Sequence, residues 1–287
     1  MTTLTHSTVS AQISTDRKYA PTGSGLSFVG LMRSEWIKLW SVRSTVWLLS
    51  VAVVVSLGMA AVTAWATTLQ ISSMGGPSDL STLPAADQAG IILQASTFGV
   101  FFGQLIVAVL GVLVISGEYS TGMIMSTLTA VPRRLGALAA KGVVLFAVTF
   151  LVGVVSTVGS FLVATPMLAG LGLSSSLLDP AISLPLLGAS LYLALVAVFA
   201  LGIGTVVRSA AFGISAALGT LLVLPIGLSM IPAPWATDVS PYLLSNAGTS
   251  LFSTTAGMEP GQGVLVVLGW VVASVGVAAV LLKKHDA

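Results

Sequence analysis

The charged side chains that could carry chemistry gather in one stretch, which runs from Ile115 to Arg134 between two long apolar segments. It holds Glu118 near its start and Arg133 beside Arg134 at its end, with Ser, Thr and Gly between them. Such a polar stretch cannot lie in hydrocarbon, so we expect it to form a loop on one face of a bilayer. Two roles fit Glu118. It either pairs with Arg133, Arg134 or Arg43 and holds the loop in shape, or it docks a partner protein through charge.

The middle of this stretch has its own periodicity. Ile124, Leu128 and Val131 recur with the spacing of one helical face, which predicts a short amphipathic helix. Pro132 should end that helix, because the residue before a proline is pushed out of the α region. The loop is therefore expected to present a structured surface, formed by this short helix, just outside the membrane.

The sequence contains few residues that could catalyse a reaction. The sequence contains no Cys, and its two His residues, His6 and His285, lie near the termini. No Gly-x-x-x-x-Gly-Lys-Ser/Thr loop occurs, so we expect no bound ATP, no catalytic residues and no metal site in this chain. An intramembrane hydrolase would need a base near a serine, and we expect none within the bundle.

Composition places the chain in a membrane. Mean hydropathy is +1.04 and only 7% of the residues are charged, which is far below a soluble domain. Six apolar runs approach the roughly 20 residues that cross a bilayer. They cover about 46–66, 91–115, 142–164, 184–207, 210–231 and 263–282, within a transmembrane domain of 46–282. The predicted fold class is an all-α integral membrane protein.

The bases decide the predicted orientation. An even number of spans puts both termini on one side, and all eleven bases fall on that side, so we expect it to be cytosolic. The sequence pI of about 9.1 therefore reflects membrane orientation, and we expect no binding to nucleic acid. The bases are Arg17, Lys18, Arg33, Lys38, Arg43, Arg133, Arg134, Lys141, Arg208, Lys283 and Lys284. The opposite loops hold Asp79, Asp87, Asp179, Asp238 and Glu259.

A helix is expected before the first span. Residues 1–25 have no apolar periodicity and predict a flexible cytosolic tail, as do residues 283–287. Residues 26–45 predict an amphipathic helix lying in the membrane interface, since two Trp residues alternate with bases. Its apolar side should carry Phe28, Met32, Trp36, Leu39 and Trp40. The simpler alternative is a basic flank that only orients the first span.

The order of these features resembles a known family. Three motifs in this order are similar to the actinobacterial permease subunits of type-2 ATP-binding-cassette transporters: Ser34-Glu35-Trp36-Ile37-Lys38-Leu39-Trp40-Ser41-Val42-Arg43-Ser44-Thr45, then Ser116-Gly117-Glu118-Tyr119-Ser120-Thr121-Gly122, then Val131-Pro132-Arg133-Arg134. The resemblance covers most of the chain from about residue 26.

That resemblance implies an exporter in the bacterial cell membrane. Two permease subunits, the same or related, would work with two separate ATPase subunits that bind the ATP. It also implies an ATPase-coupling surface, which would comprise Glu35, Lys38, Arg43, Glu118, Tyr119, Thr121, Gly122, Ile124, Leu128, Arg133 and Arg134. An ATP-independent secondary transporter is the alternative, although it should show ionisable residues at mid-membrane and none is expected there.

Three smaller expectations concern packing. Gly99 with Gly103, and Gly269 with Ala273, have the spacing that lets helices approach closely. Pro225 should kink the fifth span. Residues 232–262 are too short to span yet contain apolar residues, so they form either a re-entrant segment or an outer loop packed on the bundle.

Overall fold

The computed structural model describes residues 28–73, 80–120, 134–253 and 257–284, and every regular element within these ranges is helical. Six helical segments among them are long and apolar enough to cross a membrane. This confirms the predicted all-helical fold class and fits a multi-pass membrane protein. The six are Arg43–Ser73, Ala85–Glu118, Leu135–Leu171, Pro180–Val207, Ala210–Ser229 and Pro260–Lys283.

Most of these helices are longer than the apolar runs that predicted them. Helix α2 (Arg43–Ser73) continues past the expected end of the first span, and α6 (Arg134–Leu168) begins well before the third. The second span consists of α3 (Ala85–Thr97) and α4 (Val100–Ser120), which meet at Phe98 and Gly99. Helical hydrogen bonding does not stop where the side chains become polar, so hydropathy alone underestimates these lengths.

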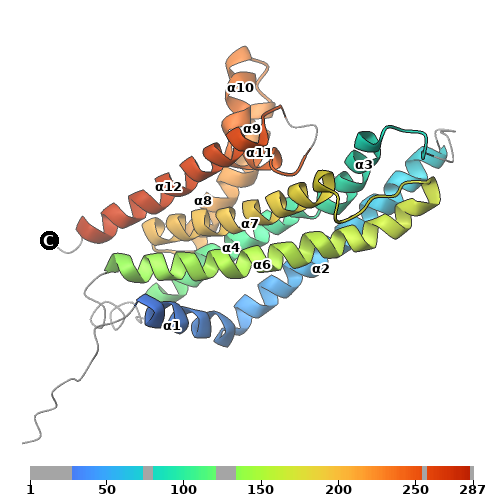
Figure 1. The fold of residues 1–287 in the computed structure, drawn as a ribbon. Coiled ribbons are helices and arrows are strands. Elements are labelled where there is room, and N and C mark those ends of the chain that lie inside the picture. Colours follow the sequence, from blue (N-terminus) through green and yellow to red (C-terminus); the bar gives the residue numbers. More distant parts are fainter. Residues whose placement is uncertain (1–27, 74–79, 121–133, 254–256, 285–287) are drawn as a thin grey trace, which may run out of the picture.

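Helix α7 (Pro180–Val207) forms the centre of the bundle. Helices α4, α6 and α12 (Pro260–Lys284) surround it, and its largest fully buried side chains are Tyr192 and Phe199 (Figure 1). Asp179 caps its start by accepting a 2.9 Å hydrogen bond from the Ala181 N–H. Because other helices surround α7, the apolar side chains on all its sides pack against protein rather than lipid.

The fifth span is interrupted as Pro225 predicted. Helix α8 (Ala210–Leu218) passes into a π-helical turn, η2 (Gly219–Val223), and then into α9 (Leu224–Ser229). The Leu224 N–H bonds the Gly219 carbonyl across this wider turn. Because proline lacks an N–H, the helix around it cannot keep its ordinary ladder of hydrogen bonds.

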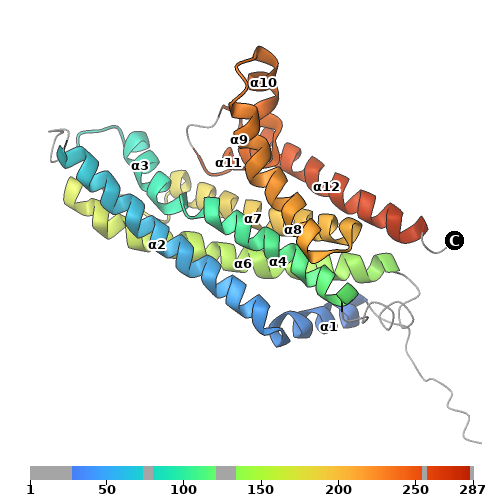
Figure 2. The same cartoon turned by 180° about the vertical axis from the view of Figure 1, so that it is seen from behind.

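The segment between the fifth and sixth spans folds into short helices: α10 (Pro234–Val239), η3 (Ser240–Tyr242) and α11 (Leu244–Thr249). Helix α11 packs against α12 and α7, and its Leu244 is fully buried (Figure 2). A Cβ on Gly248 would lie 2.0 Å from the Tyr192 ring, so only glycine fits there. The α11 part of the segment is thus packed on the bundle, whereas α10 projects away from it and its Trp235 is exposed (Figure 2).

The two ends of the bundle differ in charge. We call the end where α4, α7 and α12 finish the basic end, because its described bases are Arg33, Lys38, Arg43, Lys141, Arg208 and Lys283 (Figure 1). We call the opposite ends of the spans, where α3, α7 and α12 begin and α9 finishes, the acidic end. Its described charges are Asp87, Asp179, Asp238 and Glu259.

The two glycine pairs behave differently. A Cβ on Gly99 would lie 2.6 Å from the Ser56 Cα, so this glycine does let α2 and the second span approach closely. Gly269 has open space around it and Ala273 is exposed, so the expectation of close packing at that pair is wrong within this chain.

Candidate functional site

Helix α1 (Phe28–Ser41) lies across the basic end and packs against α6 and α2 (Figure 1). The expected helix 26–45 is interrupted, because Val42 is not helical and α2 begins directly after it. Helical periodicity places Met32, Glu35 and Leu39 on one side. Glu35 and Leu39 are buried and Met32 is half-buried, so this side faces the bundle. A carboxylate is therefore carried into the protein on the packed face of the helix.

The five apolar residues predicted for one side of this helix differ in exposure. Phe28, Trp36 and Trp40 are 46%, 43% and 47% exposed, whereas Leu39 is buried. The two indole rings lie 5.9 Å apart. One edge of the apolar side therefore packs on the bundle, and the other edge is available to a membrane interface.

Four charged side chains meet where α1 contacts the ends of α4 and α6. Lys141 Nζ lies 2.5 Å from Glu35 Oε2 and 2.8 Å from Glu118 Oε1. Lys38 Nζ lies 2.7 Å from Glu35 Oε1 and 3.4 Å from Glu118 Oε1. We call Glu35, Lys38, Glu118 and Lys141 the charge network. It joins three helices that are separated by up to 106 positions in the sequence.

Burial makes this network dependent on all its members. Glu35 and Lys141 are each 5% exposed and Glu118 is 8% exposed, whereas the Lys38 side chain is 40% exposed. Two negative and two positive charges balance one another, which offsets the several kcal/mol that burial of each ion costs. Removing a buried member would leave its partners uncompensated.

The environment shifts the ionisation of the two α1 residues in opposite directions. Burial alone would raise the pKa of Glu35, but the nearby Lys141 and Lys38 outweigh it and hold the pKa below its ordinary value. Burial would lower the pKa of Lys38, but Glu35 and Glu118 hold it above its ordinary value. Each group is therefore stabilised in its charged form.

The chemistry of this arrangement is ion pairing. Lys141 donates to two carboxylates, and none of its hydrogen bonds to the described residues reaches a serine hydroxyl. It therefore lacks the base–hydroxyl contact that nucleophilic catalysis requires. The described residues also hold no group of three or more His, Cys, Asp or Glu that could bind a metal ion.

The structure brings together three of the predicted coupling residues and separates a fourth. Glu35, Lys38 and Glu118 belong to the charge network. Arg43 is exposed and makes no ion pair with Glu118, so the predicted Glu118–Arg43 pair is wrong. The Lys141 ammonium, which α6 places inside the bundle, occupies the position beside Glu118.

The other predicted residues cannot be compared in this way. Thr121, Gly122, Ile124, Leu128 and Arg133 lie outside the described residues, and so does the expected helix before Pro132. Tyr119 and Arg134 belong to helices α4 and α6, but their side chains are not described.

Sequence reasoning missed Lys141 as a site residue, because it counted this lysine only among the bases that set orientation. The expectation that no base lies within the bundle is therefore wrong. A signal was present: Lys141 follows Leu138-Ala139-Ala140 and precedes Gly142-Val143-Val144, so a helix through it has no polar neighbour. A lone base in such a run is a functional hypothesis by itself.

No family model matches the sequence, and no curated protein matches it significantly. What the chain does must therefore be inferred from its own residues.

Proposed function

We propose that this chain is the permease subunit of a type-2 ATP-binding-cassette exporter in a bacterial cell membrane. Two such subunits, identical or related, pair in the bilayer and move substrate with ATP that two separate ATPase subunits hydrolyse. The basic end faces the cytosol together with both termini, in keeping with the positive-inside rule. The chain itself contains no nucleotide-binding loop, so ATP hydrolysis belongs to the partner.

The observation that carries this proposal is the attachment of α1. This helix lies outside the spans, yet the charge network ties it to α6 through the 2.5 Å contact between Glu35 and Lys141, and to the end of α4 through the 3.4 Å contact between Lys38 and Glu118. Residues 121–133, which connect α4 to α6 in the sequence, carry Thr121, Gly122, Ile124, Leu128 and Arg133 of the coupling surface that the family resemblance implies. A partner that binds α1 therefore holds a helix that shares buried ion pairs with α4 and α6.

This linkage gives ATP binding a route into the bundle. An ATPase pair that closes on ATP can shift the permease between two access states only by the difference in its affinity for them. Buried ion pairs transmit such a bias well, because α1 cannot move away from α4 and α6 without exposing or separating charges. Coupling thus needs no charged residue at the centre of the membrane.

The alternative, an ATP-independent secondary transporter, gains one supporting observation. Buried ionisable groups are typical of proton- or ion-coupled transport, and Glu118 and Lys141 lie within spans. We favour the ATP-driven permease because the network is charge-balanced and lies at the basic end, where it binds a helix outside the spans. A proton carrier would instead need an acid near mid-span.

Reconstitution separates the two functions. The purified chain in lipid vesicles should show no ATP hydrolysis and no transport under a proton or sodium gradient. Both activities should appear when a nucleotide-binding ATPase that co-purifies with it, or is encoded beside it, is added. Gradient-driven transport by the chain alone would overturn the proposal.

Substitution tests the site within that assay. Glu118→Gln, which keeps the side-chain shape, should lower ATP-dependent transport several-fold while the protein still inserts into the membrane. Asp238→Asn makes the same charge change at the acidic end and should leave transport unchanged. Equal transport by both variants and the unmodified chain would remove the charge network from the coupling route.

A further inference from the structure

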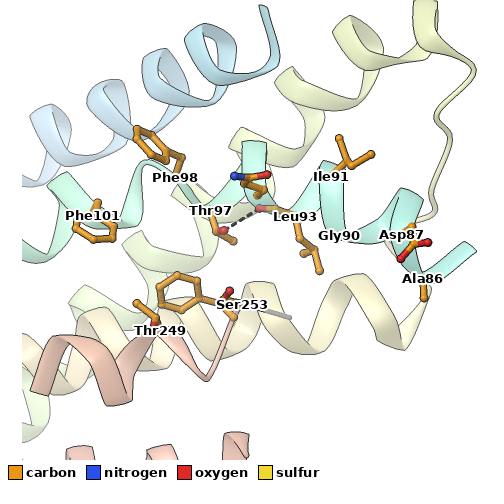
Figure 3. A pocket seen from close by; sticks show the side chains of 12 residues that line it. Ala86, Asp87, Gly90, Ile91, Leu93, Thr97, Phe98, Phe101, Thr249 and Ser253 are labelled. Carbon is orange, nitrogen blue, oxygen red and sulfur yellow. Dashed lines mark hydrogen bonds between the residues drawn. The ribbon is translucent and has the colours of Figure 1, made fainter. Parts of the chain in front are cut away.

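A second site is formed at the acidic end. A cleft of about 610 Å³ opens between α3, the beginning of α4 and the chain around the end of α11 (Figure 3). It shares no residue with the charge network. Both polar and apolar side chains line it, which is typical of a small-molecule site with one recognised polar group.

One end of the cleft carries an acid without a base. Asp87 is exposed in the lining, as is Gln94, and neither side chain makes an ion pair or hydrogen bond within the described part of the chain. The sequence contains no Lys or Arg between Arg43 and Arg133 or between Lys141 and Arg208. A cation that meets Asp87 must therefore come from outside the chain.

The other end of the cleft is aromatic. Phe98 and Phe101 are 41% and 51% exposed, and their rings are stacked with centroids 6.5 Å apart. Figure 3 shows Asp87 and Phe101 at opposite ends of the lining. Fourteen positions separate these two residues, which corresponds to roughly 20 Å along helices that rise about 1.5 Å per residue. Ile91 lies between them in the lining.

We infer that this cleft binds a cationic amphiphile: a molecule with an ammonium group and one long hydrocarbon chain. The ammonium lies at Asp87, and the chain follows α3 toward Phe98 and Phe101. An anionic headgroup would be repelled by Asp87, and a neutral one would leave that carboxylate without a counter-charge. Aromatic faces accept both hydrocarbon and cations, so the aromatic end of the cleft discriminates little between ligands.

A second copy of this chain is a poorer occupant. Its acidic end has the same described charges, Asp87, Asp179, Asp238 and Glu259, and so offers no base to pair with Asp87. Charge complementarity therefore favours a cationic small molecule over a copy of the chain. That this molecule is the exported substrate rests on the proposed function, whereas its binding does not.

A photoreactive probe tests the binding directly. The purified full chain, in phosphatidylcholine nanodiscs without ATPase or ATP, is irradiated with a tetradecyltrimethylammonium that bears a diazirine at its chain end. Labelled positions are then mapped by mass spectrometry. Labelling should centre on residues 98–101, and Asp87→Asn should lower it about fivefold, the largest factor expected for one exposed ion pair.

Two controls make the result decisive. Asp238→Asn should leave labelling unchanged, since Asp238 is an acid of the same end that does not line the cleft. Asp87→Lys should lower labelling by the ammonium probe and raise labelling by a probe with the same chain and a sulfate headgroup. Equal labelling by both probes, or labelling that Asp87→Asn does not change, would overturn the inference and indicate lipid-like partitioning.

The same probe separates this inference from the proposed function. Labelling at residues 98–101 that depends on Asp87, with no ATP-driven movement of the probe after an ATPase is added, would retain the site and contradict its role in export. ATP-driven transport of other molecules, without labelling that depends on Asp87, would support the proposed function and contradict the binding site.

Discussion

The two ends of the bundle use acidic residues in opposite ways. At the basic end, Glu35 and Glu118 are buried and each is bound by lysines at 2.5 to 3.4 Å. At the acidic end, Asp87 is exposed in a cleft, with no base in the segment of chain that contains it. A buried carboxylate must be compensated from within the protein, whereas an exposed one can remain available for a ligand.

The difference indicates two kinds of role. Compensated charges hold elements in place, so the charge network is suited to transmitting movement between α1 and the spans. An uncompensated charge beside aromatic surface is suited to recognition, as proposed for the cleft. The same amino-acid class is thus suited to holding helices together at one end and to binding a ligand at the other, because burial and neighbours differ.

The largest expected effect comes from removing the central ammonium. Lys141→Met leaves two buried carboxylates facing each other, and should lower the free energy of unfolding by about 3–5 kcal/mol. Unfolding in mixed micelles with increasing dodecyl sulfate measures this. Asp87→Asn, the matched change at an exposed acid, should shift stability by less than about 0.5 kcal/mol.

A neutral network provides the control for that prediction. Adding Glu35→Gln and Glu118→Gln to Lys141→Met removes the charges that were left unpaired, and should recover most of the lost stability. If Lys141→Met alone changed stability by less than Asp87→Asn, the charge network would not hold α1, α4 and α6 together.

A smaller effect is expected from pH. Because the pKa of Glu35 is lowered in the folded protein, its contribution is complete above about pH 4.3 and is lost as pH falls further. The pKa of Lys38 is raised, so its contribution is complete below about pH 10.4 and is lost as pH rises further. The contributions of Glu35 and Lys38 to the attachment of α1 should therefore be constant from about pH 5 to pH 10.

Spin labels can follow this attachment, since the chain has no natural cysteine. Labels at exposed Ser34 on α1 and Leu135 on α6 should report one distance throughout that window. The distance distribution should broaden only in stronger acid or base. A change in distance with a midpoint near neutral pH that is absent from Glu35→Gln would contradict the lowered pKa of Glu35.

The smallest effect should come from Lys38. Its side chain is 40% exposed and lies 3.4 Å from Glu118, so water screens it and Lys38→Met should cost about 0–1 kcal/mol. Unfolding under the conditions used for Lys141→Met gives the comparison. If Lys38→Met lowered the free energy of unfolding as much as Lys141→Met does, solvent exposure would not explain how much each lysine contributes to stability.

The sequence by itself determined the class of protein and the number of spans. Six apolar runs and a 7% charged fraction leave few alternatives to a helical membrane bundle, because each run must satisfy its backbone hydrogen bonds within itself. Pro225 likewise predicted a break, since a missing N–H acts locally. Such features depend only on neighbouring residues in the chain, and the sequence lists neighbours directly.

Tertiary structure decided which charges meet. Glu35 and Lys141 are separated by 106 positions, and nothing in the spacing of either residue favours Lys141 over Arg43 as a partner. The crossing of α1 beneath α4 and α6 makes that choice, and it also directs Glu35 inward and Trp36 outward on one helix. The cleft beside Asp87 has the same origin: its lining combines α3 and the start of α4 with Thr249, Phe252 and Ser253, which are about 150 positions away in the sequence. Pairings of this kind follow from helix packing, which is set by many weak contacts at once rather than by any local pattern.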